Sequence, residues 1–223
     1  MKIIVFGATG MVGQGVLREC LLAADVEAVA AVGRSGSGQR HPKLVEVVHQ
    51  DLSDLTAIED QLRAYDACFF TLGVSSVGMS EADYARITYG LTLAAGETLA
   101  RINPGTTFIY VSGMGTDSSE QGRTMWARVK GRTENALLRL PLQACIFRPG
   151  FIQPLDGIRS RTAFYNTLYT LLRPLVPLFR LAMPNQFLTT RQVGQAMLNV
   201  ARHGYKTRIL EVKDIRAAAI GGS

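Results

Sequence analysis

The sequence predicts an α/β fold, a doubly wound parallel sheet with a small C-terminal substrate lobe. Short apolar runs alternate with helical segments along residues 1–150, and such alternation is typical of parallel strands joined by crossover helices. Three glycines stand directly after the first apolar run, where sheets of this kind place a ligand-binding turn. The 223 residues are enough for a single domain with a substantial core.

The expected elements follow one another from the N-terminus. Apolar runs predict buried strands over residues 2–6, 27–32, 44–48, 67–72, 107–111, 144–147 and 209–212. Helices are expected over about residues 12–21, 54–64, 80–103, 122–138 and 190–200. Ser80 with Asp83 predicts a capping box at the start of the long helix. We expect the inner face of that helix to hold Ile87, Leu91, Ala94, Ala95 and Leu99.

The regular alternation weakens after Pro149. Residues 163–183 are apolar and are interrupted by Pro174 and Pro177. We interpret residues 151–205 as a small lobe over the open end of the sheet, where ligands of such folds bind. Residues 206–223 would then supply the last strand and a tail.

The composition is that of an ordinary soluble globular protein, with 47% hydrophobic and 19% charged residues. The three cysteines, Cys20, Cys68 and Cys145, lie far apart in apolar patterns and show no metal-binding spacing. This usage predicts reduced core thiols and a cytoplasmic protein without a metal site. A signal peptide at the N-terminus would destroy the glycine turn, so we expect none.

Charge is distributed unevenly along the chain. Residues 1–120 carry 8 basic and 14 acidic side chains, whereas residues 121–223 carry 16 basic and 4 acidic ones. We favour a solvated arginine-rich surface around an anionic cofactor. The alternatives are a surface for acidic lipid, nucleic acid or an acidic protein partner. Nucleic acid ranks low, because no nucleic-acid motif accompanies the charge.

The glycine turn comprises Gly7, Gly10 and Gly13. The first glycine permits a tight turn, the second lets backbone approach a pyrophosphate, and the third lets the helix pack close to the strand. The start of the helix offers unpaired N–H groups to phosphate. The spacing is G-x-x-G-x-x-G rather than G-x-G-x-x-G, but the strand–turn–helix context predicts a dinucleotide site.

Later strand ends carry residues suited to the same ligand. Arg34 and Ser35 follow the second strand, where an arginine recognises a 2′-phosphate, so NADP(H) is expected in preference to NAD(H). Asp51 and Leu52 follow the third strand, and either adenine recognition or helix capping would explain Asp51. After the fourth strand, backbone near the cofactor ribose is expected at Thr71, Leu72 and Gly73.

The motifs GATGMVG, GRS, DL, TLG, VSG, KG and RPG occur in this order. Their set resembles the atypical short-chain dehydrogenase/reductase family over about residues 1–215. The nearest subgroup is the NAD(P)H-binding proteins similar to the Tat-interacting protein, often described as epimerase/dehydratase-like. The resemblance implies a Rossmann-type domain, with residues 1–150 as the cofactor-binding core. It also implies an oxidoreductase or epimerase-like enzyme acting on a small carbonyl or hydroxyl substrate.

The resemblance assigns roles to individual residues. Pyrophosphate contacts fall to Gly7, Thr9, Gly10, Met11 and Val12. Contacts to the nicotinamide fall to Pro149, Gly150, Phe151 and Ile152. Ser112 matches the catalytic serine, and Lys130 matches the active-site lysine, which also contacts the cofactor.

One position departs from the family pattern Tyr-x-x-x-Lys. The chain has Trp126 four residues before Lys130, and an indole N–H cannot exchange a proton near neutrality. Trp126 could form a wall of the substrate pocket while another group acts, or it could be plain core. The other proton donors to consider are Tyr84, Tyr89, Tyr165, Tyr169 and a water held by Ser112 and Lys130.

Other interpretations of these residues stay open. Lys130 could instead form a surface ion pair with Glu134, four residues further along the helix. Gly131 costs helix stability, and close approach of a neighbouring segment would explain it. The missing tyrosine also allows a catalytically weak, NADP(H)-sensing regulatory or interaction protein. Residues 162–183 could contact a membrane surface, but we favour a packed helix pair, since two prolines and internal arginines exclude a spanning helix.

Overall fold

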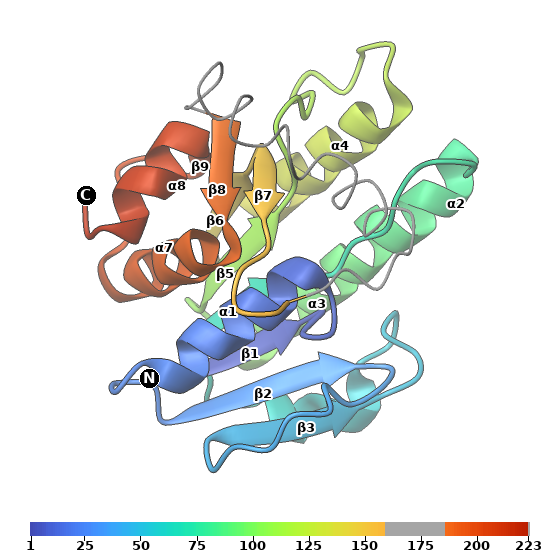
Figure 1. The fold of residues 1–223 in the computed structure, drawn as a ribbon. Helices are drawn as coiled ribbons and strands as arrows, with labels where there is room; N and C mark the ends of the chain where they lie inside the picture. Colours follow the sequence, from blue (N-terminus) through green and yellow to red (C-terminus); the bar gives the residue numbers. More distant parts are fainter. Residues whose placement is uncertain (159–185, 223) are drawn as a thin grey trace.

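The computed structural model describes residues 1–158 and 186–222. Its main sheet has seven strands in the order β3-β2-β1-β4-β5-β6-β9 (Figure 1), and all neighbouring strands are parallel. The strands are β1 (Lys2–Phe6), β2 (Ala28–Gly33), β3 (Leu44–Val48), β4 (Ala67–Phe70), β5 (Thr107–Val111), β6 (Gln143–Arg148) and β9 (Ile209–Glu211). The strand order reverses between β1 and β4, which confirms the doubly wound, Rossmann-type fold.

Helices cover both faces of this sheet. They are α1 (Met11–Leu22), the 3₁₀ helix η1 (Thr56–Leu62), α2 (Glu81–Ala85), the π-helical turn η2 (Arg86–Gly90), α3 (Leu91–Ile102), α4 (Met125–Arg139), α7 (Thr190–His203) and α8 (Val212–Ala219). One face packs against α1, α7 and α8, and the other packs against η1, α3 and α4. Figure 1 shows these two layers with the sheet between them.

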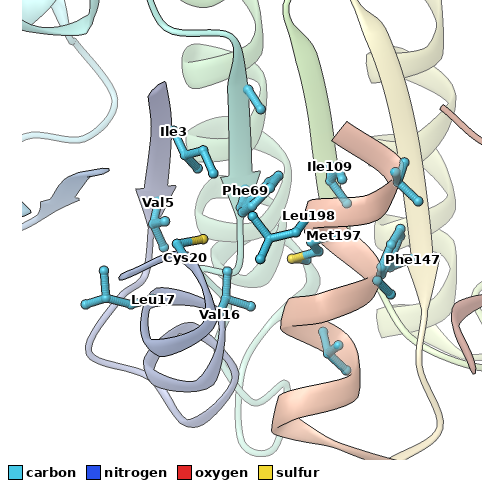
Figure 2. Close-up of a cluster of buried hydrophobic side chains, with 14 of the residues drawn as sticks. Ile3, Val5, Val16, Leu17, Cys20, Phe69, Ile109, Phe147, Met197 and Leu198 are labelled. Carbon is cyan, nitrogen blue, oxygen red and sulfur yellow. The ribbon is translucent and has the colours of Figure 1, made fainter. Parts of the chain in front are cut away.

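The first strand shows why a continuous apolar run forms here. Ile3 and Val5 point into the cluster with α1 and α7, whereas Ile4 and Phe6 point into the cluster on the opposite face. Because strand side chains alternate between faces, a strand covered on both sides needs apolar residues at every position. Figure 2 shows the first cluster, with Val16 of α1 and Met197 of α7 near β1 and β4.

Two of the expected helices differ in form from the expectation. The segment expected as a helix over 54–64 is a 3₁₀ helix, ended by Ala64 in a left-handed conformation. Ser80 caps the long helix as predicted, since its side chain accepts from the Asp83 N–H, but a π-helical turn interrupts it. The predicted inner face of this long helix is therefore partly wrong. Thr88 and Thr92 are buried, while Ile87, Leu91 and Ala94 are only half-buried.

Helix α4 begins at Met125 rather than near residue 122. The N–H of Gly122 donates to the Asp117 carboxylate at 2.6 Å, and the Gly122 carbonyl accepts from Arg128. These bonds hold the segment before α4 in a loop conformation. At the C-terminus, the expected tail is the helix α8, because a capping box formed by Glu211 and Asp214 starts it and Ile215 is buried.

The region after β6 contains a second, two-stranded parallel sheet that the sequence did not predict. It pairs β7 (Phe151–Gln153) with β8 (Phe187–Thr189). The capping box of Thr189 and Gln192 then opens α7, whose apolar face lies in the main core. The apolar stretch 162–183, with Tyr165 and Tyr169, lies outside the described residues. None of the helices in residues 1–158 and 186–222 has the length and apolar character needed to cross a bilayer.

Gly131 lies where the chain before α4 crosses the helix. A Cβ atom at this position would lie 1.8 Å from the carbonyl oxygen of Asp117, which explains why a helix-weakening residue stands there. We expect Gly131→Ala to lower the unfolding free energy by about 2–3 kcal/mol, because the backbone must move apart. Urea denaturation measures this change.

Gly90 offers a matched control for that substitution. It is also helical, with φ −59°, but a Cβ atom there would meet no atom within 4 Å. Gly90→Ala should therefore stabilise the protein by about 0.5–1 kcal/mol. Equal effects at the two positions would contradict the role of the crossing.

Candidate functional site

The strand order brings the predicted site residues together along one edge of the sheet. Parallel strands end at the same edge, and neighbouring strands lie about 4.8 Å apart. From β3 to β6 the strand ends carry Asp51, Arg34, Gly7, Thr71 and Ser112, with Pro149 after β6. Residues that are up to about 140 positions apart in the sequence therefore form one continuous row.

The glycine turn is tight, as expected of a turn that would hold a pyrophosphate. Gly7 has φ +82°, and a Cβ atom on Gly13 would lie 2.0 Å from the Gly7 carbonyl oxygen, so α1 packs directly on the turn. At Gly10 the only atom within 4 Å of a Cβ position is the Gly7 oxygen, at 3.4 Å. Helix α1 has no side-chain cap and no acidic residue in its first turn. Its first N–H groups are thus available to an anion.

The other residues assigned to the pyrophosphate also lie in this turn. The Thr9 carbonyl accepts from the Gln14 side chain at 3.0 Å, which fixes the peptide between the first two glycines. Met11 and Val12 form the first turn of α1 and are partly buried against the core. Their side chains anchor the helix start, and only their N–H groups face the turn as potential donors.

Arg34 and Ser35 are exposed in the loop after β2. The Arg34 carbonyl accepts from the Gln50 side chain at 3.0 Å, and Glu46 of β3 accepts from the Ser37 N–H at 2.9 Å. These contacts hold the backbone of the loop. Within residues 1–158 and 186–222, no carboxylate forms an ion pair with the Arg34 guanidinium, so it is available to an external anion.

The Asp51 carboxylate stabilises a local turn before η1, whose N-cap is Leu55 without a side-chain cap. The Asp51 Oδ1 accepts from the Ser53 N–H at 2.9 Å and from the Ser53 hydroxyl at 2.5 Å, and these bonds lower its pKa. Leu52 is buried in the core beneath. Helix capping by Asp51 is therefore wrong, because η1 begins at Thr56 after the N-cap Leu55, and adenine recognition stays a prediction.

The end of β4 is tied to the glycine turn. The Thr71 hydroxyl donates to the Phe6 carbonyl at 2.7 Å, and a Cβ atom on Gly7 would lie 2.7 Å from the Leu72 nitrogen. Gly73 is exposed and has open space around its Cα. Residues 71–73 thus pass directly beside the turn, as expected for backbone that borders a cofactor.

Ser112 and Lys130 meet at the end of β5. The Lys130 ammonium donates to the carbonyl oxygen of Ser112, and its Nζ lies 3.7 Å from a Cβ position on Gly113. The Ser112 hydroxyl donates to the Phe147 carbonyl at 3.2 Å, a long bond that a ligand oxygen could replace. A lysine has three N–H donors, and the described residues accept only one of them.

Glu134 does not form the surface ion pair with Lys130 that we considered. It is fully buried and accepts from both the Nε and a terminal nitrogen of Arg148 on β6. Arg148 also donates to Glu211 at 3.3 Å. Burial lowers the pKa of Lys130 to about 8, although the negative charge of Glu134 opposes this shift. Arg148 thus takes up the carboxylate that would otherwise hold Lys130.

Trp126 lies on the first turn of α4, half-buried against the loop that follows Ser112. Its ring atom Cη2 is 3.4 Å from a Cβ position on Gly115, so a larger residue at 115 would displace the indole. The ring therefore borders the segment of residues 112–116 rather than filling the central core. This placement agrees with a wall of the site.

The tyrosines considered as proton donors are poorly placed among the described residues. Tyr84 is 2% exposed, and its phenol interacts with the equally buried Tyr110 on β5. The ring of Tyr89 is covered by the Arg132 guanidinium, 4.2 Å from its centroid. Tyr165 and Tyr169 lie outside the described residues. The remaining candidate, a water held by Ser112 and Lys130, stays a prediction.

The turn after β6 packs against the loop after β5. The Pro149 carbonyl accepts from the Met114 N–H at 2.8 Å, and a Cβ atom on Gly150 would lie 2.5 Å from the Gln186 carbonyl oxygen. Phe151 packs on Phe187 with ring centroids 5.0 Å apart, and Ile152 is buried in the core. Backbone at residues 149–150, rather than the two apolar side chains, is therefore nearest to the Ser112 loop.

Two features of this site were missed from the sequence. The buried pair of Glu134 and Arg148 resembles ordinary surface charge in the sequence, and no local pattern distinguishes it. The bond between Met114 and Pro149 joins two loops through their backbones, which leaves no signature in residue type. The motifs VSG and RPG each lie at the end of a strand, and consecutive strands of such a sheet are commonly neighbours, which is the signal that could have suggested a bond between the two loops.

The lowered pKa of Lys130 predicts a pH-dependent stability. The folded protein loses this proton near pH 8, whereas the unfolded chain keeps it up to the ordinary pKa of 10.5. Stability rises with pH wherever the unfolded state binds more protons. We therefore expect the unfolding free energy of the wild type, relative to Lys130→Met, to be constant below pH 7.5 and to increase from pH 8 to 10.5. Denaturation series at these pH values measure the difference in unfolding free energy between the two proteins. A difference that does not change with pH would contradict the lowered pKa of Lys130.

Comparison with known proteins places these features in context. A family model described as NAD(P)H-binding matches residues 7–164, a range that contains the glycine turn, Ser112, Lys130 and the turn after β6. No match was found among curated proteins.

Several solved structures share the fold. The enzyme WbmF of Bordetella bronchiseptica, in complex with NAD+, superposes with a TM-score of 0.65 at 17% identity, over 98% of this chain and 76% of that one. The oxidoreductase ylbE of Lactococcus lactis gives 0.68 at 14% identity over 99% and 97%. A UDP-N-acetylglucosamine 4-epimerase of Methanobrevibacter ruminantium, in complex with UDP-N-acetylmuramic acid, gives 0.65 at 16% identity over 94% and 75%.

Proposed function

Because this chain belongs to the NAD(P)H-binding family, we propose that it is an NADP(H)-dependent oxidoreductase or epimerase-like enzyme acting on a small carbonyl or hydroxyl substrate. The observation that carries the proposal is the contact of Lys130 with the Ser112 carbonyl at the end of β5. The contact holds an ammonium group against the serine that follows β5, and this supports a site in which a nicotinamide would bind beside both residues. The family is confirmed, whereas the cofactor preference and the reaction are our proposals.

The chain's own groups suit each part of the cofactor. The N–H groups at the start of α1, with Gly7 and Gly10, would hold the pyrophosphate. Backbone of residues 71–73 and 149–150 would border the ribose and nicotinamide. A nicotinamide bound there supplies or accepts the hydride.

Proton transfer falls to Ser112 and Lys130 in place of the usual tyrosine. The Ser112 hydroxyl can donate to the substrate oxygen after leaving the Phe147 carbonyl. The free N–H groups of Lys130 can hold a water against that oxygen and, with a pKa near 8, can replace its proton. Trp126 cannot exchange a proton, and its indole would orient the substrate by packing.

Enzymatic activity is tested by NADPH oxidation with a panel of aldehydes and ketones. We expect slow turnover by the wild type, a higher rate for Trp126→Tyr, and at least a hundredfold loss for Lys130→Met. The tyrosine would restore a general acid, a contribution of about 10²–10⁴-fold in enzymes. No turnover by either the wild type or Trp126→Tyr, despite tight NADPH binding, would refute the enzymatic proposal.

The preference for NADP(H) depends on Arg34. Its guanidinium has no carboxylate partner in the described part of the chain, so it can pair with a 2′-phosphate. We expect Arg34→Ala to weaken NADPH binding by about 10–100-fold, since hydrogen bonds to charged groups contribute about 1.5–3 kcal/mol, and to leave NADH binding unchanged. Arg40→Ala, an exposed arginine of the same loop, is the control in fluorescence titrations. A parallel loss for both nucleotides would rule out phosphate recognition.

The second candidate function is an NADP(H)-sensing regulatory or interaction protein. Trp126 at the position of the proton donor favours it, together with the basic second half of the chain. Affinity capture with and without NADPH tests it. Partner profiles that do not depend on NADPH would count against this function.

A further inference from the structure

The described residues that directly follow the strands on the Ser112 side carry no ionisable side chain. They are residues 71–79 after β4, 112–116 after β5 and 149–155 after β6. By contrast, the segments after β2 and β3 carry Arg34, Arg40, His41, Lys43, His49, Asp51 and Asp54. Within the residues that the structure describes, the carboxyl edge therefore has a charged half, where β2 and β3 end, and an uncharged half, directly after β4, β5 and β6.

Three carboxylates that flank the uncharged half are already bound within the protein, whereas Arg123 between β5 and α4 is exposed. The Asp117 carboxylate accepts from the Gly122 N–H at 2.6 Å, and Asp156 pairs with Arg191 at 2.9 Å. Glu81 pairs with Arg128 at 2.6 Å. Among the described residues, Lys130 is the cation placed at Ser112, and its role there is toward the reacting oxygen.

Apolar side chains are exposed on the same half of the edge. Val74 is 42% exposed and Val77 86% exposed in the segment after β4, and Met114 is 44% exposed after β5. Met114 is held beside the β6 turn by its bond to Pro149, and the Trp126 indole lies against the next residue, Gly115. Exposed apolar side chains that gather beside a polar centre are typical of a ligand-binding surface.

We infer that the substrate is an uncharged, apolar carbonyl compound, an inference that rests on the proposed function. In the reduction, the carbonyl carbon would receive a hydride from NADPH and the oxygen a proton from the water held by Ser112 and Lys130, while the Lys130 ammonium would return a proton to that water. The products are an alcohol and NADP+. The alkyl or aromatic part of the substrate lies against Val74, Met114 and Trp126, where a carboxylate or phosphate would lose water without gaining a partner.

A matched pair of ketones tests this substrate class. Heptan-2-one and 6-oxoheptanoate differ only in a terminal methyl group against a carboxylate. Trp126 is the only tryptophan of the chain, so its emission reports binding to the NADP+-loaded protein, in which ketone reduction cannot proceed. We expect heptan-2-one to bind at least tenfold more tightly than 6-oxoheptanoate, with calorimetry as a second measurement.

Variants locate the binding surface. Met114→Glu and Val74→Asp should each weaken heptan-2-one binding about tenfold. Val45→Asp is the control, because Val45 is similarly exposed, at 48%, but lies on β3 at the opposite edge of the sheet; it should change binding less than twofold.

The outcomes separate this inference from the proposed function. Binding of 6-oxoheptanoate as tight as that of heptan-2-one would overturn the inference. If Arg123→Gln then abolished the binding of 6-oxoheptanoate, the exposed Arg123 would be the residue that binds its carboxylate. NADP+ binding without binding of either ketone would also overturn the inference alone. Failure to bind NADP+ would overturn the proposed function and the inference with it.

Discussion

Arg148→Met should lower the unfolding free energy by about 3–5 kcal/mol, the usual cost of leaving a buried charge without its partner. Glu134 is fully buried, and Arg148 binds it through two nitrogens with only 12% of its own side chain exposed. Without the guanidinium, the carboxylate must remain charged in the core or take up a proton. Urea or thermal denaturation of the folded protein measures the loss.

Two further variants show whether the loss comes from the buried charge. The double variant Glu134→Gln, Arg148→Met removes both charges and should recover most of the stability, because no ion is left unpaired. Arg202→Met breaks the more exposed pair with Asp25 and should cost at most about 1 kcal/mol. If the single Arg148 variant were no less stable than the Arg202 variant, the pair would not hold α4 on β6.

Gly13→Ala should weaken NADPH binding by at least about a hundredfold, equivalent to about 2.7 kcal/mol. The added Cβ would lie 2.0 Å from the Gly7 carbonyl oxygen and 2.7 Å from the Thr71 hydroxyl. Helix α1 must then move away from the turn, and its N–H groups no longer converge on the pyrophosphate. Titration of NADPH fluorescence measures the affinity.

Gly90→Ala serves again as the control, since it adds a methyl group to a helix without a close neighbour. It should leave NADPH affinity within twofold of the wild type. If Gly13→Ala retained full affinity while remaining folded, the glycine turn would not be the pyrophosphate site.

The sequence by itself determined the fold class and the row of strand ends. Apolar runs, the three glycines and the alternation with helices are local signals, and local signals are sufficient when each strand is buried on both faces. The parallel sheet then brings Arg34, Thr71, Ser112 and Pro149 to one edge with Gly7. The close approach expected at Gly131 is also present in the structure.

The tertiary structure decided the interactions between residues far apart in the chain. Lys130 could have paired with Glu134, one turn away on the same helix. Instead Arg148 of β6 binds that carboxylate, and Lys130 donates to the Ser112 carbonyl. The sequence does not distinguish a buried charged residue from an exposed one, because burial depends on which other segments pack over the residue. For the same reason, only the packed structure shows Trp126 against Gly115 and places an uncharged, partly apolar edge beside Ser112.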